Sequence, residues 1–281
     1  MTIPAARPVD RAYFLAVRII RHFLCLGWLE THVMNKTAPT DFFRNDCSTG
    51  ERTDVHIRRV IEFAEMLWSL ARIDGFDKLL LQLNDPLGIE GTFAELEVGK
   101  LLMICGVHFR FVVPQGTREK DYDLEIFMPD GRSAFADTKC KIESTSISPS
   151  TIKTSLNKAR EQLPPDSPGM IFLKVPDVWL KASHQWVAND QGTETISSTI
   201  RAFLRGTGRI VSVKVYGAII HLEGPHSLQF YEAREIDNEK SRFGTEWELF
   251  KELELFGTGP NWLTLMKIVN PLPSFTHPGL L

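Results

Sequence analysis

Acidic and basic side chains are concentrated in residues 120–141, which have the pattern of a β-hairpin. Two runs of strand-forming residues, 122–128 and 133–140, flank a Pro-Asp-Gly sequence that is typical of a tight turn. Side chains alternate along a strand, so Asp137 and Lys139 should share a face. Antiparallel pairing of the two strands can then bring Asp123 close to Asp137. We expect two carboxylates and an ammonium group to converge on this hairpin.

Such a cluster suits metal-assisted hydrolysis. Two carboxylates at hydrogen-bonding range repel each other unless a proton or a cation lies between them, and Mg²⁺ prefers oxygen ligands. Lys139 could hold or deprotonate a water molecule, or neutralise the charge that develops on a phosphate. The reaction that matches these groups is hydrolysis of a phosphodiester.

The order of these residues resembles the PD-(D/E)xK, or restriction-endonuclease-like, nuclease superfamily. The resemblance covers roughly residues 91–175 and rests on Glu95 in a helix, Asp123 in the first hairpin strand, and Asp137-Thr138-Lys139 in the second. It implies that Asp123 and Asp137 bind Mg²⁺ or Mn²⁺, that Glu95 helps to bind the metal or its water, and that Lys139 assists the nucleophile. Tyr122 replaces the proline of the family's name. The implied fold is an α/β, restriction-endonuclease-like mixed central sheet flanked by helices.

Each of these residues also has a structural interpretation. The charged face of the hairpin could be a solvated surface with cross-strand salt bridges. Glu95 could complete a capping box with Thr92, in which its carboxylate bonds the Thr92 amide. Glu97 lies roughly 200° further round the helix, so only one of the two glutamates can face the hairpin, and we expect it to be Glu95. Gly99, one turn later, should allow the helix to approach closely.

The elements around the hairpin predict an α/β core with additions at both ends. We expect strands at 107–113, 170–175 and 209–222, and helices at 93–105 and 148–163. Two helices, 12–29 and 54–83, precede them, with a loop at 36–52 and a break near Gly75. A further helix at 245–256 and an extended tail should follow. The predicted organisation is a helical N-terminal segment 1–85, a nuclease-like core 86–222 and a C-terminal extension 223–281.

Overall charge is nearly balanced, so a polyanion would have to bind to a local patch. The 281 residues carry 32 Lys and Arg against 35 Asp and Glu, a formal net charge of -3. One basic patch follows the hairpin, and a second lies at 199–221. For the second patch, solvated helix faces are an equally good interpretation. Residues that could contact nucleic acid, with DNA favoured over RNA, are Lys141, Lys153, Lys158, Arg160 and Gln162.

Other classes of protein fit the sequence less well. The histidines and cysteines lack zinc-site spacing, and the sequence contains no P-loop, dinucleotide fingerprint or GxSxG motif. Helix 12–29 is interrupted by charges, so we expect a helix packed on the protein and no membrane span, with a lipid-surface helix as the alternative. Free thiols and a cytoplasmic location are expected, and a homodimer is left open. The alternative to a nuclease is an inactive module that keeps the fold and binds nucleic acid or a protein partner.

Overall fold

The structure is a computed structural model that describes residues 8–35, 42–43, 50–113, 116–128, 130–142, 145–176, 179, 191–223 and 226–244. The described residues fall into two compact units, with the boundary between Ser69 and Leu70.

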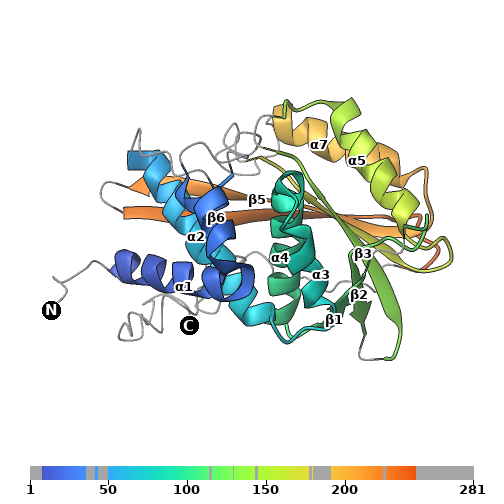
Figure 1. Ribbon diagram of the computed structural model, residues 1–281. Helices are drawn as coiled ribbons and strands as arrows, with labels where there is room; N and C mark the ends of the chain where they lie inside the picture. Colours follow the sequence, from blue (N-terminus) through green and yellow to red (C-terminus); the bar gives the residue numbers. More distant parts are fainter. Residues whose placement is uncertain are drawn as a thin grey trace, which may run out of the picture. The chain divides into compact units, whose positions relative to one another are not determined.

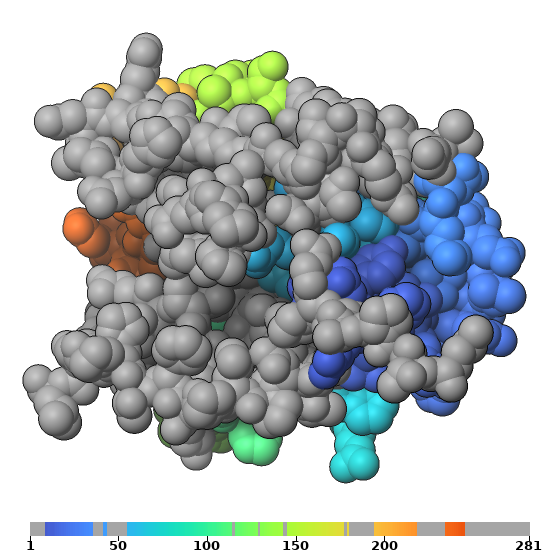
Figure 2. Space-filling view, turned by 90° about the vertical axis from the view of Figure 1, so that its left-hand side faces the viewer, coloured from blue at the N-terminus to red at the C-terminus, as the bar shows by residue number. Residues whose placement is uncertain are grey.

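The first unit is built from two long helices around an aromatic core. Helix α1 (Pro8–Leu29) continues into a π-helical turn (Glu30–Met34), and α2 (Gly50–Leu70) follows. The rings of Trp28 and Phe63 stack with centroids 5.6 Å apart, and Phe43 lies 5.0 Å from Phe63. Part of α2, light blue in Figure 2, reaches the surface. The prediction that helix 12–29 packs on the protein is confirmed by its buried Ala12, Ala16 and Ile20.

By length and composition, the stretch Val9–Met34 could cross a membrane. Its most apolar 18-residue window has a mean hydropathy of 1.4, and 39% of that window is buried. Core helices of soluble proteins and N-terminal signal sequences pass the same test. The expected absence of a membrane span therefore stays a prediction.

The second unit contains a six-stranded mixed sheet. Its strands lie in chain order: β1 (His108–Phe111), β2 (Leu124–Phe127), β3 (Ser133–Cys140), β4 (Gly169–Lys174), β5 (Ile210–Glu223) and β6 (His226–Asp237). Strands β3, β4 and β5 are parallel to one another, whereas β1–β2, β2–β3 and β5–β6 pair antiparallel. The parallel pairs require crossovers, which α5 (Pro149–Gln162) and α7 (Gln191–Leu204) provide. The chain is therefore α/β, as predicted.

Helices cover both faces of this sheet (Figure 1). On one face, α5 and α7 pack against Ile171 and Leu173 of β4 in a continuous apolar core. On the other, α4 (Ile89–Ile104) contacts the sheet through Lys174, the next residue of β4, which pairs with Glu97. This alternation along β4 explains why the strand is buried on both sides.

Glycines set how closely the neighbouring elements approach one another. Gly75 has φ +81° and precedes the short helix α3 (Phe76–Gln82), which confirms the predicted break there. A Cβ at Gly99 would lie 2.5 Å from the Phe111 ring, so the expected close approach of α4 is also confirmed. Gly106, at φ +69°, follows the end of α4 as a C-terminal cap.

The structure differs from the prediction at several boundaries. Helix α4 begins at Ile89, four residues before residue 93. Strand β6 was not predicted, and it places residues after 222 inside the sheet rather than in an extension. The sheet-containing unit begins at Leu70, before the predicted boundary at residue 85. Most of the predicted loop 36–52, the helix 245–256 and the C-terminal tail lie outside the described residues.

Candidate active site

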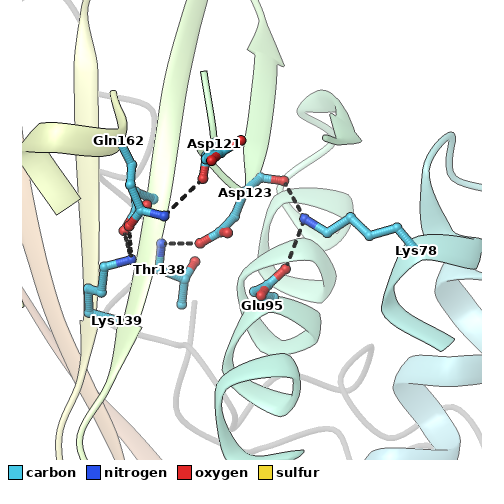
Figure 3. A network of polar contacts seen from close by, with 8 residues as sticks. Lys78, Glu95, Asp121, Asp123, Thr138, Lys139 and Gln162 are labelled. Atoms are coloured by element: carbon cyan, nitrogen blue, oxygen red, sulfur yellow. Dashed lines mark hydrogen bonds and ion pairs between the residues drawn. The ribbon is translucent and has the colours of Figure 1, made fainter. Parts of the chain in front are cut away.

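Three acidic side chains from three different elements come together on one side of the hairpin. Glu95 belongs to α4, Asp123 immediately precedes β2, and Asp137 lies in β3. Figure 3 shows Glu95 and Asp123 converging from the helix and the strand. Their charges are close enough for Asp123 to raise the pKa of both Glu95 and Asp137. The predicted convergence of Asp123 and Asp137 is therefore present, with Glu95 beside them.

The register of the hairpin fixes where Asp123 lies. Leu124 pairs with Ala136, and the amide of Asp123 donates to the Ala136 carbonyl at 3.0 Å. Asp123 therefore lies at the end of the β2–β3 ladder, close enough to Asp137 for its charge to raise the pKa of that residue. Oδ2 of Asp123 accepts a 2.6 Å hydrogen bond from the amide of Thr138, which orients the carboxylate toward β3.

Lys139 is held by groups from two elements. Its Nζ lies 2.5 Å from Oδ1 of Asp137, and it donates a 2.6 Å hydrogen bond to Oε1 of Gln162 at the end of α5. The amide group of Gln162 in turn donates to the carbonyl of Asp121 at 3.1 Å. Gln162 therefore bridges the lysine and the segment that carries Asp123.

A second lysine, Lys78 of α3, enters the same cluster. Its Nζ lies 3.2 Å from Oε2 of Glu95 and 3.5 Å from the main-chain carbonyl of Asp123 (Figure 3). The whole residue is 5% exposed. Lys78 was not among the residues predicted from the sequence, because a lone lysine in a seven-residue helix carries no local signal of a distant partner.

Burial and mutual repulsion raise the affinity of the carboxylates for protons. Burial, and then the charge of Asp123, raise the pKa of Glu95 to about 8, while Lys78 opposes the shift. The same two causes raise the pKa of Asp137 well above its ordinary value. Burial lowers the pKa of Lys139, but the surrounding carboxylates, Asp137 first, outweigh it and raise that pKa above the ordinary value. The three carboxylates of the site therefore carry more negative charge than its two lysines neutralise.

The donor atoms suit a hard divalent cation. Neither oxygen of Asp137 accepts a hydrogen bond of ordinary geometry from the part of the chain that the structure describes, although both are buried. A fully buried carboxylate that has Lys139 as its ion-pair partner and lies next to a second carboxylate offers the oxygen ligands that Mg²⁺ takes. Within the described residues, no three His, Cys, Asp or Glu side chains are already grouped as a ready metal site. Asp123 and Asp137 are thus the pair whose chemistry fits such an ion, with Glu95 held by Lys78.

The two glutamates of α4 have separate partners. Glu97 lies 2.7 Å from Lys174 of β4, on the parallel part of the sheet, whereas Glu95 faces the hairpin cluster. The expectation that Glu95, and not Glu97, faces the hairpin is confirmed. The capping-box alternative for Glu95 is wrong, because α4 begins at Ile89 and Thr92 is a buried residue inside the helix.

The residues predicted to contact nucleic acid fall into two groups. Lys153 and Lys158 are exposed on α5, and Lys141 at the end of β3 is close enough to Lys158 that the two charges interact. Arg160 instead lies 5.6 Å above the ring of Phe203 in α7, and Gln162 contacts Lys139. The structure therefore groups Lys141 with Lys158 and places Gln162 at the carboxylate cluster.

The second basic patch, at 199–221, is not a continuous surface. Lys214 is 3% exposed and pairs with Glu235 at 3.5 Å, and Arg209 lies 3.7 Å from Glu119. Of its four lysine and arginine residues, Arg201 and Arg205, at the end of α7, are exposed. The alternative interpretation of this patch, a cationic helix end, accounts for those two arginines.

The cluster combines three carboxylates, two lysines and a glutamine from α3, α4, the β2–β3 hairpin and α5. The geometry and charge of this cluster are the basis for the function proposed below. Comparison of the chain with family models, curated proteins and solved structures found no match.

Proposed function

We propose that this chain is a Mg²⁺-dependent nuclease, with Mn²⁺ as an alternative ion, that hydrolyses phosphodiester bonds of nucleic acid, with DNA as the favoured substrate. The observation that carries the proposal is the closeness of Asp123 to Asp137, whose Oδ1 lies 2.5 Å from the Nζ of Lys139. Burial and the charge of Asp123 raise the pKa of Asp137 even with Lys139 beside it, and a divalent cation bound by the two carboxylates would relieve their repulsion.

Asp123 and Asp137 would hold the ion, and Glu95 would add the third carboxylate of the cluster. The chemistry that a bound Mg²⁺ supplies is polarisation of a phosphate oxygen and activation of a water molecule. In the hydrolysis, the water oxygen gives up a proton to solvent and bonds to phosphorus, the bond from phosphorus to the leaving sugar oxygen breaks, and that oxygen takes up a proton from solvent.

Lys139 would act as a cation rather than as a base. Its pKa is raised by the neighbouring carboxylates, so the ammonium form persists at neutral pH. A protonated lysine can stabilise the negative charge that develops on the phosphate, and it can donate a hydrogen bond to the attacking water. Gln162 would keep the ammonium group in place, because it binds both Lys139 and the main chain next to Asp123.

The order of elements supports a restriction-endonuclease-like fold. The glutamate-bearing helix α4 is followed by β1, the β2–β3 hairpin with its two aspartates and lysine, and α5 with Gln162. This is the order that the resemblance to PD-(D/E)xK nucleases implies. The predicted contacts to nucleic acid at Lys141, Lys153 and Lys158 follow on β3 and α5.

The alternative, a module without catalysis that binds nucleic acid or a protein partner, makes a different prediction. The nuclease requires a divalent cation for cleavage, whereas a binding module shows no turnover with any ion. Plasmid, linear, branched and single-stranded DNA, with RNA for comparison, should be incubated with the full chain in Mg²⁺, Mn²⁺ or EDTA. Cleavage of at least one substrate that is lost in EDTA supports the nuclease, and no cleavage of any of them contradicts it.

A further inference from the structure

A close contact between the start of α3 and β1 places Lys78 at the carboxylate cluster. The amide of Phe111 donates to the carbonyl of Asp74 at 2.9 Å. A Cβ on Gly75 would lie 2.0 Å from the main-chain oxygen of Phe111, so the chain can pass there only with glycine. The first turn of α3 starts from this point, and Lys78 extends from it toward Glu95.

The ammonium group of Lys78 has the surroundings of a bound cation. Its Nζ lies between a carboxylate oxygen of Glu95 and the carbonyl oxygen of Asp123, at 3.2 and 3.5 Å. Its side chain is 3% exposed, and that of Glu95 is 11% exposed. Oxygen atoms of these two kinds are also what Mg²⁺ and Ca²⁺ select.

Stability does not account for this ion pair. Desolvating two charges costs several kcal/mol, and apolar residues of similar volume often serve a protein core equally well. Glu95 instead lies within electrostatic range of Asp123 and Lys139, and its charge also acts on Asp137. A positive charge at this place would be useful to any reaction that builds negative charge over the hairpin.

We propose that Lys78 supplies the second positive charge of the active site, held by Glu95, so that the enzyme needs one divalent cation, at Asp123 and Asp137. The inference rests on the proposed nuclease function and deepens it. In enzymes with two metal ions, one ion serves the attacking oxygen and the other the leaving oxygen. Here the lysine would stand where a second ion could bind, and Glu95 would position it.

The test is the number of Mn²⁺ ions that the full chain binds, measured by calorimetry. Wild type should bind one equivalent, and Asp137→Asn should bind none. Lys78→Met keeps the length of the side chain and removes the charge, which frees Glu95 for an ion. It should bind a second equivalent, or bind the first with a Kd at least tenfold lower. Lys78→Arg keeps the charge and should bind one equivalent, like wild type.

A second variant covers the case in which Lys78→Met does not fold. Glu95→Gln should keep one equivalent of Mn²⁺, with a Kd within about threefold of wild type, because Glu95 holds the lysine rather than the ion. Its kcat should fall, since Lys78 loses its anchor. Loss of Mn²⁺ binding in Glu95→Gln would overturn the inference.

The outcomes separate this inference from the proposed function. If Asp137→Asn abolishes Mn²⁺ binding and cleavage while Lys78→Met binds like wild type, the nuclease stands and the role of Lys78 is wrong. Two equivalents in wild type would also overturn that role. If wild type shows no Mn²⁺ binding and no cleavage, both the role of Lys78 and the nuclease function are contradicted.

Discussion

The Nζ of Lys139 donates a 2.6 Å hydrogen bond to Oε1 of Gln162, which joins the end of β3 to the end of α5. The glutamine was predicted as a contact to nucleic acid, and the structure places it at the lysine of the proposed active site. The crossover helix that completes the parallel pair β3–β4 thus also holds Lys139 on the charged face of the hairpin.

Gln162→Leu should lower kcat by about tenfold or more, the effect of losing one hydrogen bond to a charged group. KM for nucleic acid should change little, because the glutamine acts on Lys139 and not on the substrate. Gln162→Glu keeps the acceptor and should retain more of the rate. The exposed neighbour Glu161, changed to Gln, is the control. A raised KM with unchanged kcat would instead show that Gln162 contacts nucleic acid.

Removal of the cluster's charge should change how stability depends on pH. The pKa of Glu95 is raised to about 8, above its ordinary value of 4.5, so the folded chain holds this proton more tightly than the unfolded chain does. The stabilising contribution is therefore complete below about pH 4.5 and is lost as the pH rises through 8. The raised pKa of Asp137 acts in the same direction.

Melting temperatures between pH 5 and 9 in EDTA test this dependence. Wild type should lose more stability across the range than Glu95→Gln, which cannot titrate there. Ca²⁺ should restore more of the melting temperature at pH 8 than at pH 5, because the ion competes with protons for the carboxylates. Equal pH dependence in wild type and Glu95→Gln would contradict the assignment.

Two glycines in α4 should respond oppositely to the same substitution. Gly99→Ala would force a methyl group to 2.5 Å from the Phe111 ring and should destabilise the chain by about 1–3 kcal/mol. A Cβ at Gly91 meets no atom within 4 Å, so Gly91→Ala should stabilise by up to about 1 kcal/mol through helix propensity. Urea denaturation measures both. A stabilised Gly99→Ala would show that α4 does not need its close approach to β1.

Neutralising the basic residues after the hairpin should weaken binding of nucleic acid and its salt dependence. Lys141, Lys153 and Lys158 changed together to Gln should reduce the log-log salt slope by roughly one unit for each phosphate that these lysines neutralise in the wild-type complex. Binding is measured in Ca²⁺, which can occupy the carboxylates without enforcing octahedral geometry. Lys240→Gln, at an exposed lysine far along the chain, is the control. An unchanged salt slope in the triple variant would show that these lysines do not contact the phosphates of nucleic acid.

The hairpin and α5 could be predicted from the sequence because their signals are local. A Pro-Asp-Gly turn, alternating strand residues and the apolar positions Ile152, Leu156 and Ala159 specify those elements without reference to the rest of the chain. All three of these apolar side chains are fully buried. The closeness of Asp123 to Asp137 follows from the hairpin, so this half of the site could be predicted from the sequence.

The other parts of the fold and of the site depend on tertiary contacts, which leave no local pattern in the sequence. Lys78 and Glu95 are brought together by the packing of α3 against α4 and β1, which includes the close contact of Gly75 with Phe111. The start of α4 was misplaced because Gly91 lies inside the helix, where glycine usually argues against helix. Strand β6 was missed because charged residues interrupt its alternation of apolar residues. Its pairing with β5 stabilises the strand although the local sequence does not favour it.

Metal-dependent cleavage should require Asp137, and a comparison of Asp137→Asn with Asp130→Asn tests this requirement. Asp130 lies exposed in the turn of the same hairpin, and asparagine can keep its hydrogen bond to the Arg132 amide. With Mg²⁺, wild type and Asp130→Asn should cleave nucleic acid at similar rates, whereas Asp137→Asn should lose about 100-fold or more in kcat with its fold intact by circular dichroism. Full activity of Asp137→Asn would contradict a role of Asp137 in metal-dependent cleavage.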